Sequence, residues 1–253
     1  MSVAETQCGH RLLTEHLAVA SVLAGRFAHD FDNVLMGVLG FAELAQASVE
    51  PNSEAYHLIA DVLRVAEQGR RATRQMHRFS HSGRRVAGAS NLAAVWAIEA
   101  RELSDPPHDR ARIAADIPCD LPDIAIPPDH LRAVINSVVS NALEAAGVCG
   151  CVQLCAVTVD REEPFDALPE ELLPGQFVEL TIRDDGPGFS PELLDRIAEA
   201  PFSTTKVRHR GLGLSIALLS LATYGGGLII EPASPRGTTV ILALPTRRAD
   251  ASR

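Results

Sequence analysis

The sequence has very little lysine, few aromatic side chains and no Cys-x-x-Cys pair. Aromatic residues make up 4% of a 253-residue chain that is 46% hydrophobic, so the core must be built from leucine, valine, isoleucine and alanine. Lys206 is the single lysine, and arginine supplies the other permanent positive charges. The net charge is −9, and the acidic excess falls in residues 91–253. This balance excludes the basic surface of a nucleic-acid-binding protein.

The cysteines and the apolar runs exclude two further classes. Cys149, Cys151 and Cys155 share one strand parity, and we interpret them as small buried hydrophobic side chains rather than metal ligands. The amino terminus has no basic start followed by an apolar core, so it does not resemble a signal peptide. Residues 211–230 carry no charge, but three glycines at 225–227 divide them into a helix and a strand. We therefore expect a cytoplasmic protein without membrane insertion.

Residues 11–80 predict a helical hairpin. Apolar side chains recur at alternating steps of four and three along residues 11–48, which is a heptad seam: Leu13, Leu17, Ala20, Ala24, Phe27, Phe31, Val34, Val38, Phe41 and Ala45. After a turn at residues 49–53, with Asn52 or Ser53 as N-cap, a second seam follows: Leu58, Val62, Val65, Gly69, Ala72, Met76 and Phe79. Two such helices cannot cover their apolar surface alone. We expect a homodimer with a four-helix bundle; the alternative is a hairpin covered by the second domain.

His29 stands outside the first seam. At about 100° per residue its imidazole points away from Phe27 and Phe31, toward solvent. Asp30 can accept one ring N–H, fix the tautomer and stabilise the cation that forms when the other nitrogen attacks a phosphorus. Asn33 follows one turn later on the same side. A solvated helix residue is the alternative interpretation of an isolated His-Asp pair, and the motifs downstream favour the chemical one.

Beyond a polar, glycine-containing linker at residues 81–90, the pattern changes to short strands between helices, which predicts an α/β sandwich over residues 91–248. Residues 1–10 and 249–253 are expected as tails. The expected strands are Arg112–Ile117, Cys151–Val159, Phe177–Asp184, Gly227–Glu231 and Thr238–Leu244, and the expected helices are Leu92–Glu102, Asp129–Ala146, Pro191–Glu199 and Leu212–Leu221.

Several motifs of this second domain suit a nucleotide. Asp185 stands at the end of the strongest expected strand, just beyond Asp184, and is followed by Gly186 and Gly188; a carboxylate there can accept a purine amine while glycines let backbone approach the ring. Gly211 and Gly213 open a helix, where backbone N–H groups bind phosphates. Lys206 precedes them as a candidate charge for the terminal phosphate.

The helix at residues 129–146 offers a metal ligand. Ser137, Asn141 and Glu144 share one face of it, so an amide oxygen and a carboxylate can meet the Mg²⁺ that accompanies a nucleotide. Considered alone, that helix is also consistent with a simple amphipathic helix whose polar face meets solvent.

In combination, these motifs resemble the catalytic core of a two-component sensor histidine kinase. The resemblance rests on six motifs in order: the phosphoacceptor box at residues 29–33, the asparagine box at 140–145, a first glycine box at 185–188, a phenylalanine box at 201–206, a second glycine box at 211–214, and a last glycine motif at 237–239. It covers roughly residues 11–246.

The resemblance implies a dimeric helical hairpin that carries the histidine, joined to an ATP-binding α/β sandwich. It implies that His29 takes a phosphoryl group from Mg-ATP and passes it to an aspartate on a response-regulator receiver domain. Asp30 would be its base or orienting acid, and Asn33 would hold the water or acceptor. Asp185 would read adenine and Asn141 would hold Mg²⁺. The other nucleotide-binding positions would be Gly186, Gly188, Thr204, Lys206, Gly211, Gly213 and Thr238.

The chain departs from the family pattern at three places. Ser137 stands where a second asparagine is usual, Asp32 replaces a common asparagine, and only residues 207–210 separate Lys206 from Gly211. One alternative is therefore a histidine phosphotransfer intermediate with a degenerate nucleotide domain. A second is an ATPase of the gyrase and chaperone type, which leaves His29 and Asp30 unexplained. Input would come from a separate sensor or upstream protein, from the ten or so residues before the bundle, or from a sensor outside this sequence.

Overall fold

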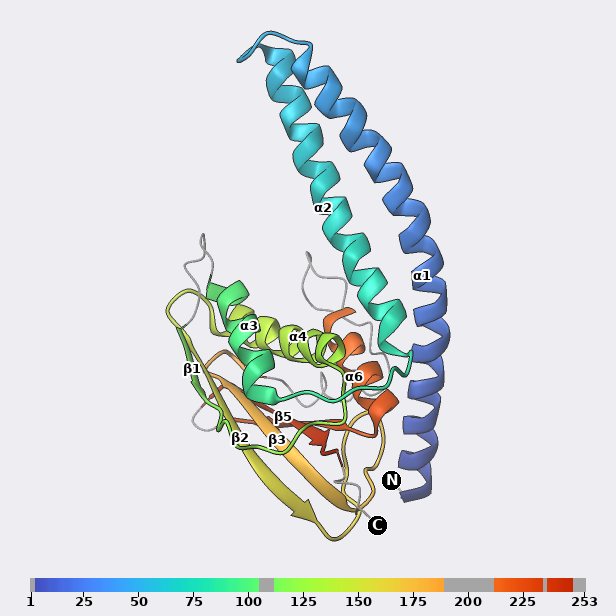
Figure 1. Ribbon diagram of the computed structural model, residues 1–253, viewed down its shortest axis with the longest axis vertical. Helices are drawn as coiled ribbons and strands as arrows, with labels where there is room; N and C mark the ends of the chain where they lie inside the picture. The colour runs from blue at the N-terminus through green and yellow to red at the C-terminus, as the bar shows by residue number, and fades with distance from the viewer. Residues whose placement is uncertain (1–2, 105–111, 189–211, 234–235, 248–253) are drawn as a thin grey trace. The chain divides into compact units, whose positions relative to one another are not determined.

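The computed structural model describes residues 3–104, 112–188, 212–233 and 236–247, which form two compact units (Figure 1). Residues 19–81 make one unit, a helical hairpin; residues 1–18 and 82–253 make the other, which contains the sheet. The expected order of a helical region followed by an α/β domain is confirmed, whereas the dimeric bundle stays a prediction. No helix in the described ranges is long and apolar enough to cross a membrane.

The hairpin consists of α1 (Val3–Ala47) and α2 (Glu54–Ser82). Helix α1 starts before the expected Arg11, because the preceding alanine, glutamate and glutamine favour helix. Asn52 adopts a positive φ of 66° in the turn. The backbone N–H of Tyr56 donates to Oγ of Ser53 at 3.2 Å, which confirms Ser53 as the N-cap of α2.

Small and polar residues form the contact between α1 and α2. A Cβ added to Gly25 would lie 2.8 Å from Cβ of Ser80, and one added to Gly69 would lie 3.1 Å from a methyl carbon of Leu35. Between these two points Asp32 reaches across to α2. Residues 25, 32 and 35 follow a heptad spacing of their own, so α1 carries two stripes with different roles.

The second stripe is the predicted apolar seam, and most of its described large side chains are exposed in the single chain, although Leu17 and Phe79 are buried and Gly69 packs against Leu35 in the α1–α2 contact. Its large side chains include three phenylalanines that are 55–77% exposed. The exposed members are Phe27, Phe31, Val34, Val38 and Phe41 on α1, with Leu58, Val62 and Val65 on α2. A contiguous apolar surface of this kind marks an interaction surface.

The second unit is built on a five-stranded sheet in the order β1-β2-β3-β5-β4. Strands β1 and β2 pair in parallel, and the other pairs are antiparallel. The strands are β1 (Arg112–Asp116), β2 (Cys151–Arg161), β3 (Gly175–Asp184), β4 (Gly227–Pro232) and β5 (Thr238–Pro245); the helices are α3 (Leu92–Ser104), α4 (Pro128–Ala146) and α6 (Leu212–Tyr224). The expected strands and three of the expected helices are present within a few residues; the helix expected at 191–199 lies outside the described residues.

Helices α3, α4 and α6 lie over one face of this sheet (Figure 1). Alternate residues of β2, β3 and β5 point into the helical layer, and all of them are buried: Val152, Leu154, Val178, Leu180, Ile182, Leu242 and Leu244. They meet the buried face of α4, which includes Leu131, Ile135 and Val138. Asp184 has the parity of this buried face, and this places a carboxylate at the edge of the core.

The other face of the sheet is partly open. The segment between β2 and β3 covers one part of it, where Ala167 and Leu172 pack with Phe177 and Ala243. Cys155 is exposed and Cys151 half-exposed, because they alternate with the core residues of β2. The expectation that these cysteines are buried is therefore wrong. The described residues contain no cluster of histidine, cysteine or acidic side chains that could hold a metal ion.

Candidate functional site

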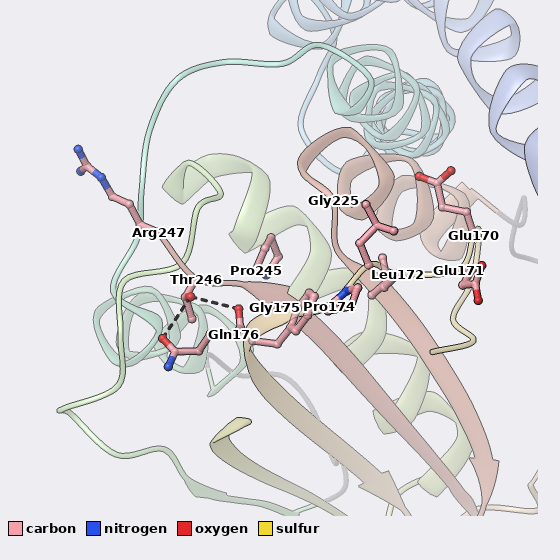
Figure 2. A pocket seen from close by; sticks show the side chains of 12 residues that line it. Glu170, Glu171, Leu172, Pro174, Gly175, Gln176, Gly225, Pro245, Thr246 and Arg247 are labelled. Atoms are coloured by element: carbon pink, nitrogen blue, oxygen red, sulfur yellow. Dashed lines mark hydrogen bonds between the residues drawn. The ribbon is translucent and has the colours of Figure 1, made fainter. Parts of the chain in front are cut away.

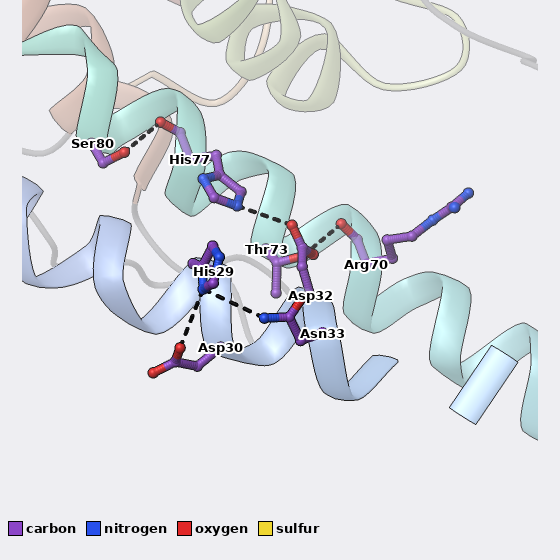
Figure 3. A network of polar contacts seen from close by, with 8 residues as sticks. All are labelled: His29, Asp30, Asp32, Asn33, Arg70, Thr73, His77 and Ser80. Atoms are coloured by element: carbon purple, nitrogen blue, oxygen red, sulfur yellow. Dashed lines mark hydrogen bonds and ion pairs between the residues drawn. The ribbon is translucent and has the colours of Figure 1, made fainter. Parts of the chain in front are cut away.

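His29 presents its imidazole to solvent, as expected. Its side chain is 72% exposed, and its Nδ1 lies 3.3 Å from Oδ1 of Asp30, whose side chain is 80% exposed (Figure 3). The tautomer with the proton on Nδ1 satisfies this contact and leaves a lone pair on Nε2. An exposed pair of this kind contributes little to stability. Its consequence is chemical, because it orients the ring and leaves a nucleophilic nitrogen free.

Asn33 lies beside the same ring. Its amide nitrogen is 3.5 Å from Nδ1 of His29, one helical turn away. When Nδ1 donates its proton to Asp30, it cannot also accept a hydrogen bond from Asn33. The amide therefore remains available to a group that approaches His29. The three residues assigned to phosphoryl chemistry are thus brought together on one side of α1.

Asp32 turns the other way, toward α2. Its Oδ2 lies 2.9 Å from Nε2 of His77, and its Oδ1 accepts a hydrogen bond from the hydroxyl of Thr73 (Figure 3). The Thr73 hydroxyl lowers the pKa of Asp32, and His77 and Arg74 act in the same direction, while desolvation opposes them. The sequence identified Asp32 only as a departure from the family pattern and did not predict its hydrogen bonds to Thr73 and His77.

In the second unit, the carboxylate of Asp184 lies among the glycines of the predicted nucleotide site. Its Oδ1 accepts the backbone N–H of Gly186 at 2.9 Å and that of Thr238 at 3.3 Å. The side chain is 5% exposed, and burial raises the pKa of Asp184 against the effect of these two N–H donors. The Thr238 side chain also hydrogen-bonds this carboxylate, so the site holds a buried acid that is fixed by the turn before β5.

Asp185, to which the sequence assigned the purine contact, has a different partner. Its Oδ1 accepts the backbone N–H of Cys151 at 3.0 Å and so ties the end of β3 to the start of β2. The assignment missed Asp184, although strand parity was available as a signal: Asp184 continues the alternation of Leu180 and Ile182, which faces the helices.

The glycines around Asp184 have no room for side chains. A Cβ on Gly186 would lie 2.7 Å from the carbonyl oxygen of Ala145, and one on Gly188 would lie 3.0 Å from that of Gly237. Gly188 and Gly237 have φ of +82° and +103°, which L side chains rarely adopt. Backbone from β3, from α4 and from the turn before β5 therefore converges on one carboxylate, which suits a flat ligand read by backbone and one acid.

Asn141 meets the first turn of α6. A Cβ added to Gly213 would lie 3.8 Å from the amide nitrogen of Asn141, 3.9 Å from its amide oxygen and 3.9 Å from the carbonyl oxygen of Ser137. Two predicted site residues from separate motifs are thus neighbours. Mg²⁺ is usually held by one or two protein oxygens together with phosphate oxygens, and an exposed amide beside a helix start suits that arrangement.

Asn136 does not substitute for the asparagine that is absent at position 137. Its amide donates to the buried carboxylate of Glu99 on α3, which Arg132 also contacts at 3.3 Å. Asn136 therefore belongs to a polar contact between α3 and α4. Thr204, Lys206 and Gly211, which were expected to bind the nucleotide, lie outside the described residues.

A pocket of about 710 Å³ lies at the opposite end of β3 from Asp184 (Figure 2). It is lined by Glu170, Glu171, the start of β3 at Gly175–Phe177, and residues 245–247 at the end of β5. The hydroxyl of Thr246 donates to the carbonyl oxygen of Gln176 at 3.1 Å on its wall. None of the predicted site residues lines this pocket.

Comparison with known proteins connects the second unit to a family of ATPases. Residues 126–248 match the family described as histidine kinase-, DNA gyrase B-, and HSP90-like ATPase. This range includes α4, the strands β2 to β5 and α6, and with them the environment of Asp184 and Asn141.

Several bacterial kinases are similar in sequence over nearly the whole chain. Sporulation kinase E of Bacillus subtilis is 24% identical over 93% of this chain, and the sensor histidine kinase ZraS of Escherichia coli is 25% identical over 91%. The sensory histidine kinase/phosphatase NtrB of Klebsiella oxytoca is 26% identical over 94%. The matches span 30%, 46% and 67% of these relatives, so the chain spans less than half the length of the first two.

Solved structures agree with the fold. Full-length ShkA in complex with AMPPNP aligns with a TM-score of 0.67 at 21% identity, covering 89% of this chain and 46% of that one. The mycobacterial sensor histidine kinase MprB aligns with a TM-score of 0.50 at 21% identity, covering 64% of this chain and 99% of that one. Together these findings confirm the resemblance to the catalytic core of a two-component sensor histidine kinase.

Proposed function

We propose that this chain is the core of an ATP-dependent protein-histidine kinase, which phosphorylates His29 and transfers the phosphoryl group to an aspartate of a response-regulator receiver domain. The observation that carries the proposal is the exposed imidazole of His29, with Asp30 at Nδ1 and Nε2 free, in a chain that also has the fold of a histidine kinase ATPase. Relatives named as a sensor histidine kinase and a sensory histidine kinase/phosphatase support the same function.

The first chemical step is attack of Nε2 of His29 on the γ-phosphorus of ATP. The new P–N bond forms as the bond between the γ-phosphorus and its bridging oxygen breaks, and ADP leaves. The imidazole becomes positively charged, and Asp30 beside Nδ1 stabilises that charge. In the second step a carboxylate oxygen of the receiver aspartate attacks the same phosphorus, and the P–N bond breaks. Both steps depend on positioning and charge rather than on a strong base.

In the nucleotide site, we propose that Asp184 makes the contact with the adenine amine. Its buried carboxylate lies where Gly186 and Gly237 bring backbone close, which supports this choice over Asp185. Thr238 holds the same carboxylate through its backbone N–H. Asp185, held by Cys151, then keeps β2 and β3 together at this edge. Mg²⁺ supplies charge neutralisation on the phosphates, and Asn141 is the residue that would hold it.

We also propose a homodimer. The exposed seam on both helices offers an apolar surface that the α1–α2 contact leaves uncovered, since that contact uses the stripe of Gly25, Asp32 and Leu35. Two hairpins joined by these seams make a four-helix bundle. An upstream sensor is proposed as the source of input, supported by relatives named as sensor kinases.

The test separates the kinase from the phosphotransfer intermediate. The full chain is incubated with γ-labelled ATP and Mg²⁺, and separately with a receiver domain that has been phosphorylated in advance. A kinase takes acid-labile label from ATP. Label that arrives only from the phosphorylated receiver, with none from ATP, would replace the kinase by the intermediate.

A further inference from the structure

Three polar side chains join α1 to α2 beside the phosphoacceptor turn. His77 and Thr73, one turn apart on α2, both bond the carboxylate of Asp32 on α1 (Figure 3). The Thr73 hydroxyl also lies 3.0 Å from the carbonyl oxygen of Arg70, so its single proton is shared between Asp32 and the α2 backbone. Figure 3 shows Asp32 between the two helices, whereas Asp30 lies on the side of α1 away from α2.

This cluster is partly enclosed. Thr73 is 4% exposed, and the side chains of His77 and Asp32 are 34% and 30% exposed. Asp32 has both carboxylate oxygens engaged by α2, so it is not available as the base for His29. Both of these donors to the Asp32 carboxylate come from α2, so the contact requires one particular rotation of α1 against α2.

The contacts on either side of the polar cluster involve glycine and do little to fix the rotation of α1 against α2. On one side Gly25 meets Ser80, and on the other Leu35 meets Gly69. Glycines allow close approach but have no side chain with which to select a register, whereas a partly buried polar group that loses its partner is penalised. The Asp32 contacts are therefore polar contacts of this interface that favour one rotation of α1 over another.

Asp32 follows His29 by three residues and precedes Asn33, all on one turn of α1. A rotation of α1 that breaks the Asp32–His77 contact also turns His29 and Asn33. We propose that Asp32, Thr73 and His77 form an interhelical clamp that positions His29 for phosphoryl transfer. The inference rests on the proposed kinase function. These are positioning residues, since they act through the setting of α1 rather than on the phosphoryl group.

The test uses matched substitutions in the full chain. Thr73→Val keeps the shape but removes the hydroxyl, and Thr73→Ser keeps the hydroxyl. His77→Leu removes the donor, and His77→Gln keeps an N–H near the place of Nε2. His81→Leu is the control, because His81 is an exposed histidine on the same helix. Each variant is assayed for the rate of labelling of His29 by γ-labelled ATP, for helix content and for the NMR signals of the His29 imidazole.

We expect Thr73→Val and His77→Leu to slow labelling by about 10- to 100-fold and to shift the His29 signals, as a small misplacement of reacting groups does. Thr73→Ser and His77→Gln should stay within about threefold of the wild type, and His81→Leu should match it. If His77→Leu does not fold, the two Thr73 variants decide, because valine has the shape of threonine.

Wild-type rates and unshifted His29 signals in folded Thr73→Val and His77→Leu would overturn the clamp. Equal losses in Thr73→Ser and Thr73→Val would overturn it as well, because the effect would not follow the hydroxyl. A wild-type chain that takes no label from ATP contradicts the kinase instead, and the imidazole signals then still decide the clamp on their own.

Discussion

Asp184 and Asp185 are neighbours in the chain, but their carboxylates hold different segments of backbone. Asp184 accepts the N–H groups of Gly186 and Thr238, inside the ring of glycines, while Asp185 accepts that of Cys151 at the start of β2. We therefore propose the first carboxylate for the nucleotide site, whereas the second joins two strands at its edge.

The first prediction compares these two residues by calorimetric titration with ATP. We expect Asp184→Ala to weaken ATP binding by about 100-fold, because a donor of the base loses a charged acceptor worth about 3 kcal/mol. Asp185→Ala should weaken it by about tenfold or less, since its effect passes through the position of β2 and β3. A larger loss with Asp185→Ala would return the purine contact to Asp185.

The second prediction concerns pH and the nucleotide-free protein. Burial raises the pKa of Asp184 above its ordinary 3.8. A carboxyl with a raised folded pKa gives most stability below its unfolded pKa, and that stability is lost as pH rises through the folded pKa. Asp184→Asn stays neutral, so we expect a higher urea midpoint than wild type at pH about 7 and a smaller difference at pH about 4.5. A difference that grows on acidification would contradict the assignment.

The third prediction tests the exposed seam. We expect the chain to sediment as a dimer, and Phe31→Glu to raise the dissociation constant by about 100-fold or more. The symmetric interface loses two buried phenylalanines, each worth about 1.5–3 kcal/mol. Val148→Glu is the control, because Val148 is also exposed but lies in the second unit. Equal dissociation of both variants would indicate that the seam is not the interface.

The fourth prediction separates transfer from labelling at Asn33. Its amide lies beside the His29 ring without being needed to hold it, so it can hold a water or an incoming aspartyl phosphate in line with the phosphorus. We expect Asn33→Ala to keep most autophosphorylation and to lose phosphatase activity toward the partner receiver. The measurement is the decay of a phosphorylated receiver mixed with each variant. Decay at the wild-type rate would leave Asn33 without this role.

The sequence predicted the parts of the fold that have a hydrophobic period. Alternation in residues 151–184 and the two heptad seams give the strands, the hairpin and the exposed surface on it. Most of the α1–α2 contact escaped prediction because Gly25, Asp32 and Thr73 carry no hydrophobic signal; Gly69 was assigned to the seam but packs against Leu35. The segment around Ala167 and Leu172, which covers part of the sheet, has no period either, and only tertiary packing reveals it.

The site residues likewise divide into those that local geometry places together and those that only the tertiary fold brings together. His29, Asp30 and Asn33 were placed together by helix geometry alone, since residues one and four positions apart have fixed directions. Asn141 and Gly213 are distant in sequence, and the resemblance, not the local pattern, brought them to one site. Asp184 could have been identified from the sequence, because it has the same strand parity as Leu180 and Ile182 and therefore points into the helical layer.

The most direct test of the kinase is where the phosphoryl group goes. Wild type, His29→Ala and Asp184→Ala are incubated with γ-labelled ATP and Mg²⁺, and the label is located by peptide mapping and exposed to acid and to alkali. We predict acid-labile, alkali-stable label on the peptide that contains His29 in the wild type, none in His29→Ala and little in Asp184→Ala. Full labelling of His29→Ala, or label that survives acid, would contradict the assignment of His29 as the phosphoacceptor.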